Sequence, residues 1–329
     1  MALPARWLSQ RTHLTCPATN WKFVEGACLK SAADLVMLDL EDSIPRDDAP
    51  LLELGRRHIA RALTTLDWGT RLRCFRPRGY ALDPELEDVE AIVRAAGSRL
   101  EGLVYPKVEH ERELERLDAR LSELEAESSL PRGAIRIAVL IESVGAEERA
   151  FAIARATERL FALVFGAFDY WSSLGPSAEY RFDHPLVDAA RMRIAKAAAA
   201  VGVPAIAEMT VNYPTRDKPE AEQQAALAEC RRDAEHAREL GFAGKWCGIP
   251  AQVATVNQVF RLAPARVSAA LYRVRAYRDA ELAGRGAAMI GGKMVDRATD
   301  RVDRVTLALA LSQGLLDDTA AREFGLLAP

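Results

Sequence analysis

Two acidic residues, Glu142 and Asp169, stand at the ends of apolar runs and are well suited to bind a metal ion. Glu142 directly follows the run at residues 135–141, and Asp169 comes just after the run at residues 161–165. Unbroken apolar runs are typical of strands covered on both faces in a parallel sheet, and residues 145–158 between them predict a connecting helix. If the strands are neighbours, both carboxylates emerge at one edge, where they suit Mg²⁺. The alternative is that both are solvated strand-end residues.

The same order of strand and helix recurs along the chain. Candidate strands cover residues 13–16, 35–40, 71–75, 102–105, 135–141, 161–165, 203–207 and 242–247. Eight such units in about 250 residues predict an α/β fold, a (β/α)₈ TIM barrel, over residues 1–262. Residues 263–329 predict a C-terminal helical extension, with helices at 264–282 and 302–316. We interpret the Gly-rich stretch 284–296 between them as a loop that packs on a neighbouring subunit.

Charged side chains gather at the ends of the predicted strands. Catalytic residues of such barrels lie at the C-terminal strand ends, so these side chains should converge on one mouth. The strand ends carry Asp39, Glu41, Asp42, Arg73, Lys107, Glu142, Asp169 and Glu208. Structural alternatives remain for the two basic residues. Arg73 could pair with Asp39 as a salt bridge, and Lys107 could hold the acid cluster together.

The composition limits the classes of partner. With 28% charged and 49% hydrophobic residues and a net charge of −3, neither a nucleic-acid nor a membrane partner is expected. No apolar stretch approaches the roughly 18 residues needed to span a bilayer, and residues 1–10 do not resemble a signal peptide. The five cysteines form no CxxC pair, which favours a reducing, cytoplasmic location. No GxGxxG follows the first strand, which argues against a dinucleotide fold.

Six short motifs carry a family resemblance. LDLEDS, YPKVE, IES, FGAFDY and GIPAQV, in that order, resemble the citrate lyase β-subunit family of the HpcH/HpaI aldolase superfamily, which includes the malyl-CoA lyases. GGKMVD in the tail is similar to the malyl-CoA lyase branch. The resemblance implies a Mg²⁺-dependent carbon–carbon lyase acting on a short hydroxy-dicarboxylic acid or its CoA thioester. Two alternatives remain: a metal-dependent aldolase or thioester hydrolase that works on a free acid without CoA, and a non-catalytic barrel subunit.

The resemblance also implies roles for individual residues. Glu142 and Asp169 match the Mg²⁺ ligands, with Glu142 also close to substrate. Arg73 matches the strand-three arginine that holds the substrate carboxylate and the developing enolate. Asp39 and Glu41 match acids that bind metal-coordinated water. The chain departs from the family pattern at several mouth positions, namely Phe75, Phe168, Glu208 and Ile249. Phe75 stands where the family usually has Asn, two residues after that arginine.

Two further residues have implied catalytic roles. Lys107 matches the lysine of the PKVE stretch, and Asp296 matches an acid that a neighbouring subunit's tail brings over the mouth. The proton acceptor is either Asp296 or a metal-bound hydroxide, and the alternative for Asp296 is a helix cap. These roles imply a homo-oligomer, a trimer or hexamer, whose ligand is a small hydroxy acid or an acyl-CoA.

Overall fold

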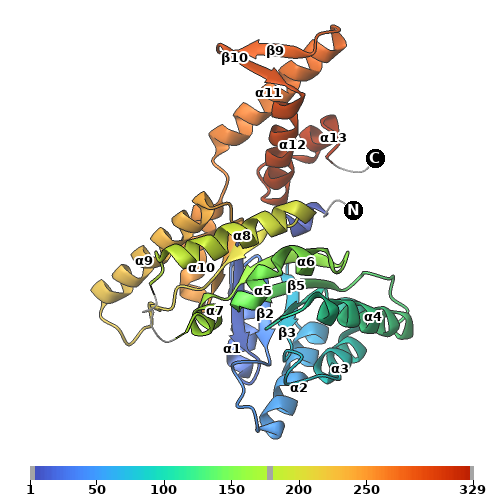
Figure 1. The fold of residues 1–329 in the computed structure, drawn as a ribbon, viewed down its shortest axis with the longest axis vertical. Helices are drawn as coiled ribbons and strands as arrows, with labels where there is room; N and C mark the ends of the chain where they lie inside the picture. The colour runs from blue at the N-terminus through green and yellow to red at the C-terminus, as the bar shows by residue number, and fades with distance from the viewer. Residues whose placement is uncertain (1–3, 176–180, 327–329) are drawn as a thin grey trace. The chain divides into compact units, whose positions relative to one another are not determined.

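The computed structural model describes residues 4–175 and 181–326, which form two units (Figure 1). The first unit is Gln10–Phe260, and the second consists of residues 4–9 and 261–326. In the first unit, parallel strands close into a barrel in the chain order β1 to β8. This arrangement confirms the predicted (β/α)₈ barrel.

The barrel strands alternate with helices along the chain. The strands are β1 (Thr12–Pro17), β2 (Leu35–Asp39), β3 (Leu72–Arg76), β4 (Gly102–Tyr105), β5 (Arg136–Ile141), β6 (Leu160–Phe165), β7 (Ala205–Ala207) and β8 (Gly244–Cys247). The helices are α1 (Trp21–Lys30), α2 (Ala49–Thr65), α3 (Glu87–Ala96), α4 (Glu111–Glu127), α5 (Val144–Glu148), α6 (Ala150–Arg155), α7 (Ala167–Ser173), α8 (Pro185–Val201), α9 (Glu220–Glu239) and α10 (Pro250–Phe260), with a 3₁₀ turn η2 (Gly97–Arg99). The prediction of one helix over residues 145–158 is wrong, because Arg149, at φ −89° and ψ 4°, leaves the helical region between α5 and α6.

The strands are apolar because both of their faces are covered. All residues of β6 are buried; Leu163 and Phe165 pack in the core between the strands and the helices, while Ala162 and Val164 are buried outside that cluster. This alternation is expected when one set of side chains fills the barrel interior and the other faces the helices. The register pairs Ile141 of β5 with Phe165 of β6. The residues that follow each strand are therefore neighbours at the C-terminal edge.

The second unit has its own small core and a β-hairpin. It contains η1 (Ala5–Trp7), α11 (Pro264–Leu282), β9 (Ala287–Ile290), β10 (Lys293–Asp296), α12 (Arg297–Ser312) and α13 (Asp318–Glu323). Its core includes Val274 of α11 and Leu307 of α12. The interpretation of the Gly-rich stretch as a loop is wrong: β9 and β10 pair antiparallel around Gly291 and Gly292. Both glycines have positive φ, 55° and 75°, as a tight two-residue hairpin turn requires.

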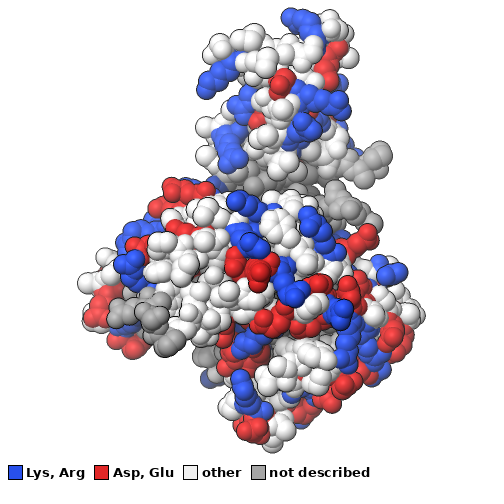
Figure 2. Space-filling model, in the orientation of Figure 1, with Lys and Arg blue, Asp and Glu red and all other residues white. Residues whose placement is uncertain are grey.

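The surface of the barrel unit carries charges of both signs. On the face visible in Figure 2, Lys and Arg side chains are interspersed with Asp and Glu side chains. All five cysteines are buried and none forms a disulfide. Among the described residues, every helix is too short or too polar to cross a bilayer.

Candidate active site

Charged side chains from consecutive strand ends meet at the C-terminal end of the barrel. Asp39 ends β2, Glu41 and Asp42 lie in the loop after it, and Arg76 ends β3. The Nε of Arg76 lies 2.6 Å from Asp39 Oδ1. Its Nη1 lies 2.9 Å from Glu41 Oε2 and 3.1 Å from Asp42 Oδ2. One guanidinium, whose side chain is 3% exposed, therefore binds three carboxylates.

Arg76, and not Arg73, is the arginine of β3 at this mouth. The guanidinium of Arg76 lies 5.4 Å from the ring centre of Trp246 on β8. Because β3 and β8 are not neighbours in the barrel, this contact crosses the interior. Arg73 instead pairs with Glu101, the residue before β4: its Nε lies 3.1 Å from the Glu101 carboxylate, which also accepts a hydrogen bond from the Arg73 amide at 3.0 Å. Arg73 thus lies at the N-terminal end of the barrel.

Strand geometry explains this correction. Successive side chains of a strand point to opposite faces, so residues three apart face opposite ways. Arg73 shares the face of Phe75, which packs in the core between the strands and the helices. The prediction that Arg73 lies at the mouth is wrong, and so is the alternative of a salt bridge between Arg73 and Asp39. The rule that catalytic residues follow strand ends would have selected Arg76.

Lys107 joins the acid cluster from the loop after β4. Its Nζ lies 2.6 Å from Glu41 Oε1 and 3.0 Å from Asp42 Oδ1. Burial works against the charged amine, but these two carboxylates outweigh it and raise the pKa of Lys107. Its backbone, at φ 51°, is held in the left-handed region, and its amide donates to Glu142 Oε2 at 3.1 Å. Lys107 therefore does hold the acid cluster together, and its contact with substrate stays a prediction.

Glu142 is a buried carboxylate in close contact with the end of β6. Its residue is only 4% exposed. A Cβ added at Gly166 would lie 2.4 Å from Glu142 Oε1, so only glycine allows this approach. Burial raises the pKa of Glu142 to about 8, and the negative charges of Glu41 and Asp169 contribute to the rise. The two predicted metal ligands are thus near enough to interact electrostatically.

Glu41 is a second buried carboxylate with a raised pKa. Burial raises the pKa of Glu41 to about 7, although Arg76 and Lys107 oppose this rise. Neither of its carboxylate oxygens has a well-directed hydrogen bond to a described residue; its contacts with the two cations are ion pairs. The role of Asp39 and Glu41 in binding metal-coordinated water stays a prediction.

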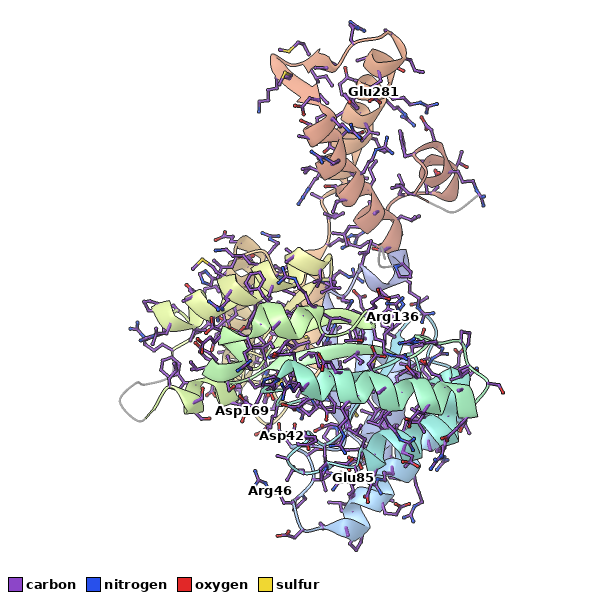
Figure 3. All side chains as sticks on the ribbon, turned by 45° about the vertical axis from the view of Figure 1, so that its right-hand side comes forward. Asp42, Arg46, Glu85, Arg136, Asp169 and Glu281 are labelled. Carbon is purple, nitrogen blue, oxygen red and sulfur yellow. The ribbon has the colours of Figure 1, made fainter. Side chains whose placement is uncertain are left out.

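The donor set at the mouth fits a hard divalent cation. Asp169 is exposed in the first turn of α7, and Figure 3 shows it at the same end of the barrel as Asp42, away from Arg136 at the start of β5. The described residues contain no group of three or more His, Cys, Asp or Glu side chains able to hold a metal. Mg²⁺ is commonly held by one or two carboxylates with water and substrate as the other ligands, whereas zinc usually takes at least three protein ligands. Glu142 and Asp169 therefore fit Mg²⁺.

Asp296 lies in the second unit and begins α12. Its Oδ1 accepts hydrogen bonds from the amides of Ala298 and Thr299 at 3.0 Å each. These bonds lower the pKa of Asp296, and the bond from the Thr299 amide has the largest effect. The helix-cap alternative is confirmed, and a further role at the mouth of another copy stays a prediction.

Glu208, after β7, is engaged within the protein. It forms an ion pair with Arg191 of α8, and both side chains are almost fully buried. The Nζ of Lys245 donates to the Glu208 carbonyl at 2.6 Å. Despite burial, the charges of Lys245 and Arg191 lower the pKa of Glu208. No sequence pattern predicted a role for Arg191, which lies in an Ala-rich helix.

Comparison with known proteins identifies the family. Residues 11–250 match the family described as HpcH/HpaI aldolase/citrate lyase. The chain belongs to this family. It is 30% identical over 291 residues to an L-malyl-CoA/beta-methylmalyl-CoA lyase of Rhodobacter capsulatus, covering 85% of this chain and 88% of that protein. It is also 30% identical over 279 residues to a (3S)-malyl-CoA thioesterase of Cereibacter sphaeroides, covering 85% and 87%. The resemblance in the motifs is confirmed, and with it carbon–carbon lyase chemistry as the activity of the family.

Solved structures share the fold. A citrate lyase from Burkholderia xenovorans LB400 is similar with a TM-score of 0.73 and 22% identity, covering 96% of this chain and 95% of that chain. The protein CitE from Mycobacterium tuberculosis, in complex with magnesium, acetoacetate and coenzyme A, gives a TM-score of 0.64 at 24% identity, covering 92% and 99%. Both likenesses agree with the barrel described above.

Proposed function

We propose that this protein is a Mg²⁺-dependent carbon–carbon lyase that acts on a short hydroxy-dicarboxylic acid carried as its CoA thioester. The observation that supports it most is the state of Glu142. This carboxylate is buried, has a raised pKa to which the charge of Asp169 contributes, and forms no ion pair with a cationic side chain of the described residues. A buried carboxylate is unfavourable in its charged form unless a cation binds to it. The thioester comes from the relatives named for malyl-CoA.

The side chains of the mouth have different roles in this proposal. Glu142 and Asp169 would hold Mg²⁺, which when bound polarises a substrate carbonyl and offsets the charge of a departing enolate. The contacts of Arg76 with described residues use Nε and Nη1, so Nη2 is left for a substrate oxygen. Asp39 and Glu41 fix that guanidinium across the mouth, which keeps it oriented without further rearrangement.

The proton acceptor in this proposal is Asp296 from a second copy of the chain. Retro-aldol cleavage of a 3-hydroxy acyl group removes the hydroxyl proton, and a carboxylate positioned over the mouth can accept it. This role requires a homo-oligomer. Mixing two inactive variants, Asp296→Asn and Arg76→Lys, tests it. In mixed oligomers some sites combine an intact Arg76 with an intact Asp296, so about a quarter of the activity should return. No recovery after confirmed subunit exchange would refute the role.

The main test is product analysis with and without metal. The purified protein is incubated with malyl-CoA, citramalyl-CoA or 3-hydroxy-3-methylglutaryl-CoA, and with the free acids, in Mg²⁺ or in EDTA. From malyl-CoA we expect equal amounts of acetyl-CoA and glyoxylate, formed only with Mg²⁺. A folded protein that cleaves none of these compounds would refute the proposal.

A thioesterase is the second candidate, because a relative of that name has the same 30% identity. Hydrolysis of malyl-CoA gives malate and free CoA, whose thiol reacts with a disulfide reagent. Carbon–carbon cleavage leaves CoA acylated, so no thiol appears. Thiol release together with malate, and without glyoxylate, would establish the thioesterase.

A further inference from the structure

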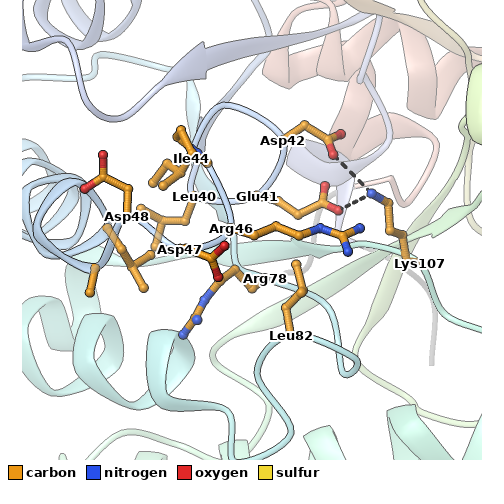
Figure 4. Close-up of a pocket in the computed structure, with 13 residues that line it drawn as sticks. Leu40, Glu41, Asp42, Ile44, Arg46, Asp47, Asp48, Arg78, Leu82 and Lys107 are labelled. Carbon is orange, nitrogen blue, oxygen red and sulfur yellow. Dashed lines mark hydrogen bonds and ion pairs between the residues drawn. The ribbon is translucent and has the colours of Figure 1, made fainter.

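A cavity of about 380 Å³ opens beside the acid cluster, within the barrel unit. It lies between the loop after β2 and the loops after β3 and β4 (Figure 4). Glu41, Asp42 and Lys107 line both this cavity and the candidate active site. Apolar side chains, among them Ile44 and Leu82, form part of its wall. A ligand at the mouth can therefore extend into this cavity.

Three basic side chains line the cavity, and two of them are already bound to carboxylates. The Nε of Arg78 lies 2.9 Å from Asp88 Oδ2, and Lys107 binds Glu41 and Asp42 as described above. The third, Arg46, is exposed and makes no hydrogen bond or ion pair with any residue that the structure describes. Arg46 is thus the lining cation available to an anion.

The loop that carries Arg46 is anchored on both sides of it. The amide of Ile44 donates to the Glu41 carbonyl and the amide of Asp48 to the Pro45 carbonyl, both at 3.1 Å. Asp48 in turn accepts from the amide of Leu51 at 2.9 Å and begins α2. Figure 4 shows the Arg46 guanidinium directed toward the end of the cavity where Glu41 meets Lys107. A long side chain on a fixed backbone can reach a ligand there at little cost in backbone order.

The acids of the cavity do not cancel this cation. Glu41 and Asp42 are compensated by Arg76 and Lys107, and Asp48 by its bond to the helix amide. Asp47 is exposed, so solvent and salt screen its charge.

We infer that Arg46 determines specificity by binding a second anionic group of the ligand, a carboxylate or a phosphate, while the first group lies at Glu142 and Asp169. This inference rests on the proposed function, because it takes those two carboxylates as the metal site. A guanidinium suits either anion, since its planar N–H groups bind both bidentately. The second carboxylate of a free dicarboxylic acid and the 3′-phosphate of CoA are the two sources of such a group.

Matched probes distinguish these sources. Calorimetric titrations in Mg²⁺ compare malate with 3-hydroxybutyrate, which lacks the second carboxylate, and CoA with dephospho-CoA, which lacks one phosphate. The proteins are the wild type, Arg46→Gln, Arg46→Lys, and Arg57→Gln as the control. Arg57 is an exposed arginine of α2 that does not line the cavity.

We expect Arg46→Gln to weaken binding of malate or of CoA by about tenfold to a hundredfold, and to change binding of its matched partner by less than about twofold. A loss for malate identifies the carboxylate, and a loss for CoA identifies the phosphate. Arg46→Lys should recover part of the loss, and Arg57→Gln should bind as the wild type does.

The inference is overturned if Arg46→Gln binds all four probes as the wild type does, or weakens both members of each pair equally. It is also overturned if the wild type prefers neither malate nor CoA to its partner. Its failure is separate from that of the proposed function. A wild type whose preference for malate or CoA depends on Arg46, but which cleaves no carbon–carbon bond, would keep the anion site and refute the lyase.

Discussion

Replacing Glu142 with glutamine tests whether the mouth is built to hold a cation. In the metal-free protein burial raises the pKa of Glu142 from 4.5 to about 8. Near and above neutral pH its carboxyl group must therefore carry an unfavourable charge or keep a proton. Glutamine has a similar size and no charge. We therefore expect Glu142→Gln to be more stable than the wild type at alkaline pH when no metal is present.

The sign and size of this effect follow from proton linkage. Because the pKa of Glu142 is higher in the folded protein than in the unfolded chain, folding favours the protonated form. The stability it contributes is complete below pH 4.5 and is lost as the pH rises through about 8. Each pKa unit corresponds to about 1.4 kcal/mol. The stability gap between variant and wild type should thus widen by at most about 5 kcal/mol from acid to alkaline pH, and by about 2 kcal/mol after relaxation around the charge.

Urea unfolding at acid and alkaline pH, in EDTA and in Mg²⁺, measures this gap. Mg²⁺ at about 100 times its Kd should stabilise the wild type by about 2.7 kcal/mol and leave Glu142→Gln unchanged. Glu85→Gln is the matched control, because the Glu85 side chain is 76% exposed. A gap between wild type and Glu142→Gln that neither widens with pH nor closes with Mg²⁺ would refute the reasoning.

Two further predictions concern the arginines of β3 and the glycine after β6. Arg76→Lys should lower kcat/KM by at least about a hundredfold, because lysine cannot bind several carboxylates and a substrate oxygen from one plane. Arg73→Lys, at the opposite end of the barrel, should change kcat/KM less than about threefold. Steady-state kinetics that rank the two variants the other way would contradict the assignment. Gly166→Ala places a methyl group 2.4 Å from Glu142 Oε1, so calorimetry should show Mg²⁺ affinity reduced at least about tenfold with the fold retained by circular dichroism. Wild-type affinity in that variant would mean that Glu142 is not a ligand.

Much of the barrel could be predicted from the sequence because a parallel sheet leaves a clear pattern. The runs that became β4 and β6 are apolar throughout, since both faces of each strand are buried. Once the strands are in order, the rule that chemistry follows the C-terminal strand ends brings Glu142 and Asp169 to one edge. This step needs no knowledge of side-chain contacts. It succeeded because only the strand that each acid follows had to be predicted correctly, and not the position of a residue within that strand.

The errors arose where a single residue or a single turn decides the outcome. Arg73 and Arg76 both belong to β3, but a strand alternates its faces, so the choice between them depends on register that the apolar pattern does not supply. Likewise, Gly291 and Gly292 indicated a loop, whereas their positive φ angles close a hairpin. Arg191 was not predictable, since its partner Glu208 is distant in sequence and only the fold brings them together.

The balance of charge at the mouth relates the proposed roles of the metal ion, Arg76 and Arg46 to one another. More carboxylates than basic side chains meet there, and two of the acids, Glu41 and Glu142, have pKa values raised mainly by burial. An anionic substrate would meet net repulsion in this mouth unless a cation arrived before it or with it. In the proposed function, Mg²⁺ at Glu142 and Asp169 would offset this repulsion locally. Arg76 cannot do so instead, because three acids hold it in place. A second negative group on the substrate then needs a cation of its own, and Arg46 is the lining basic residue that no described carboxylate has engaged.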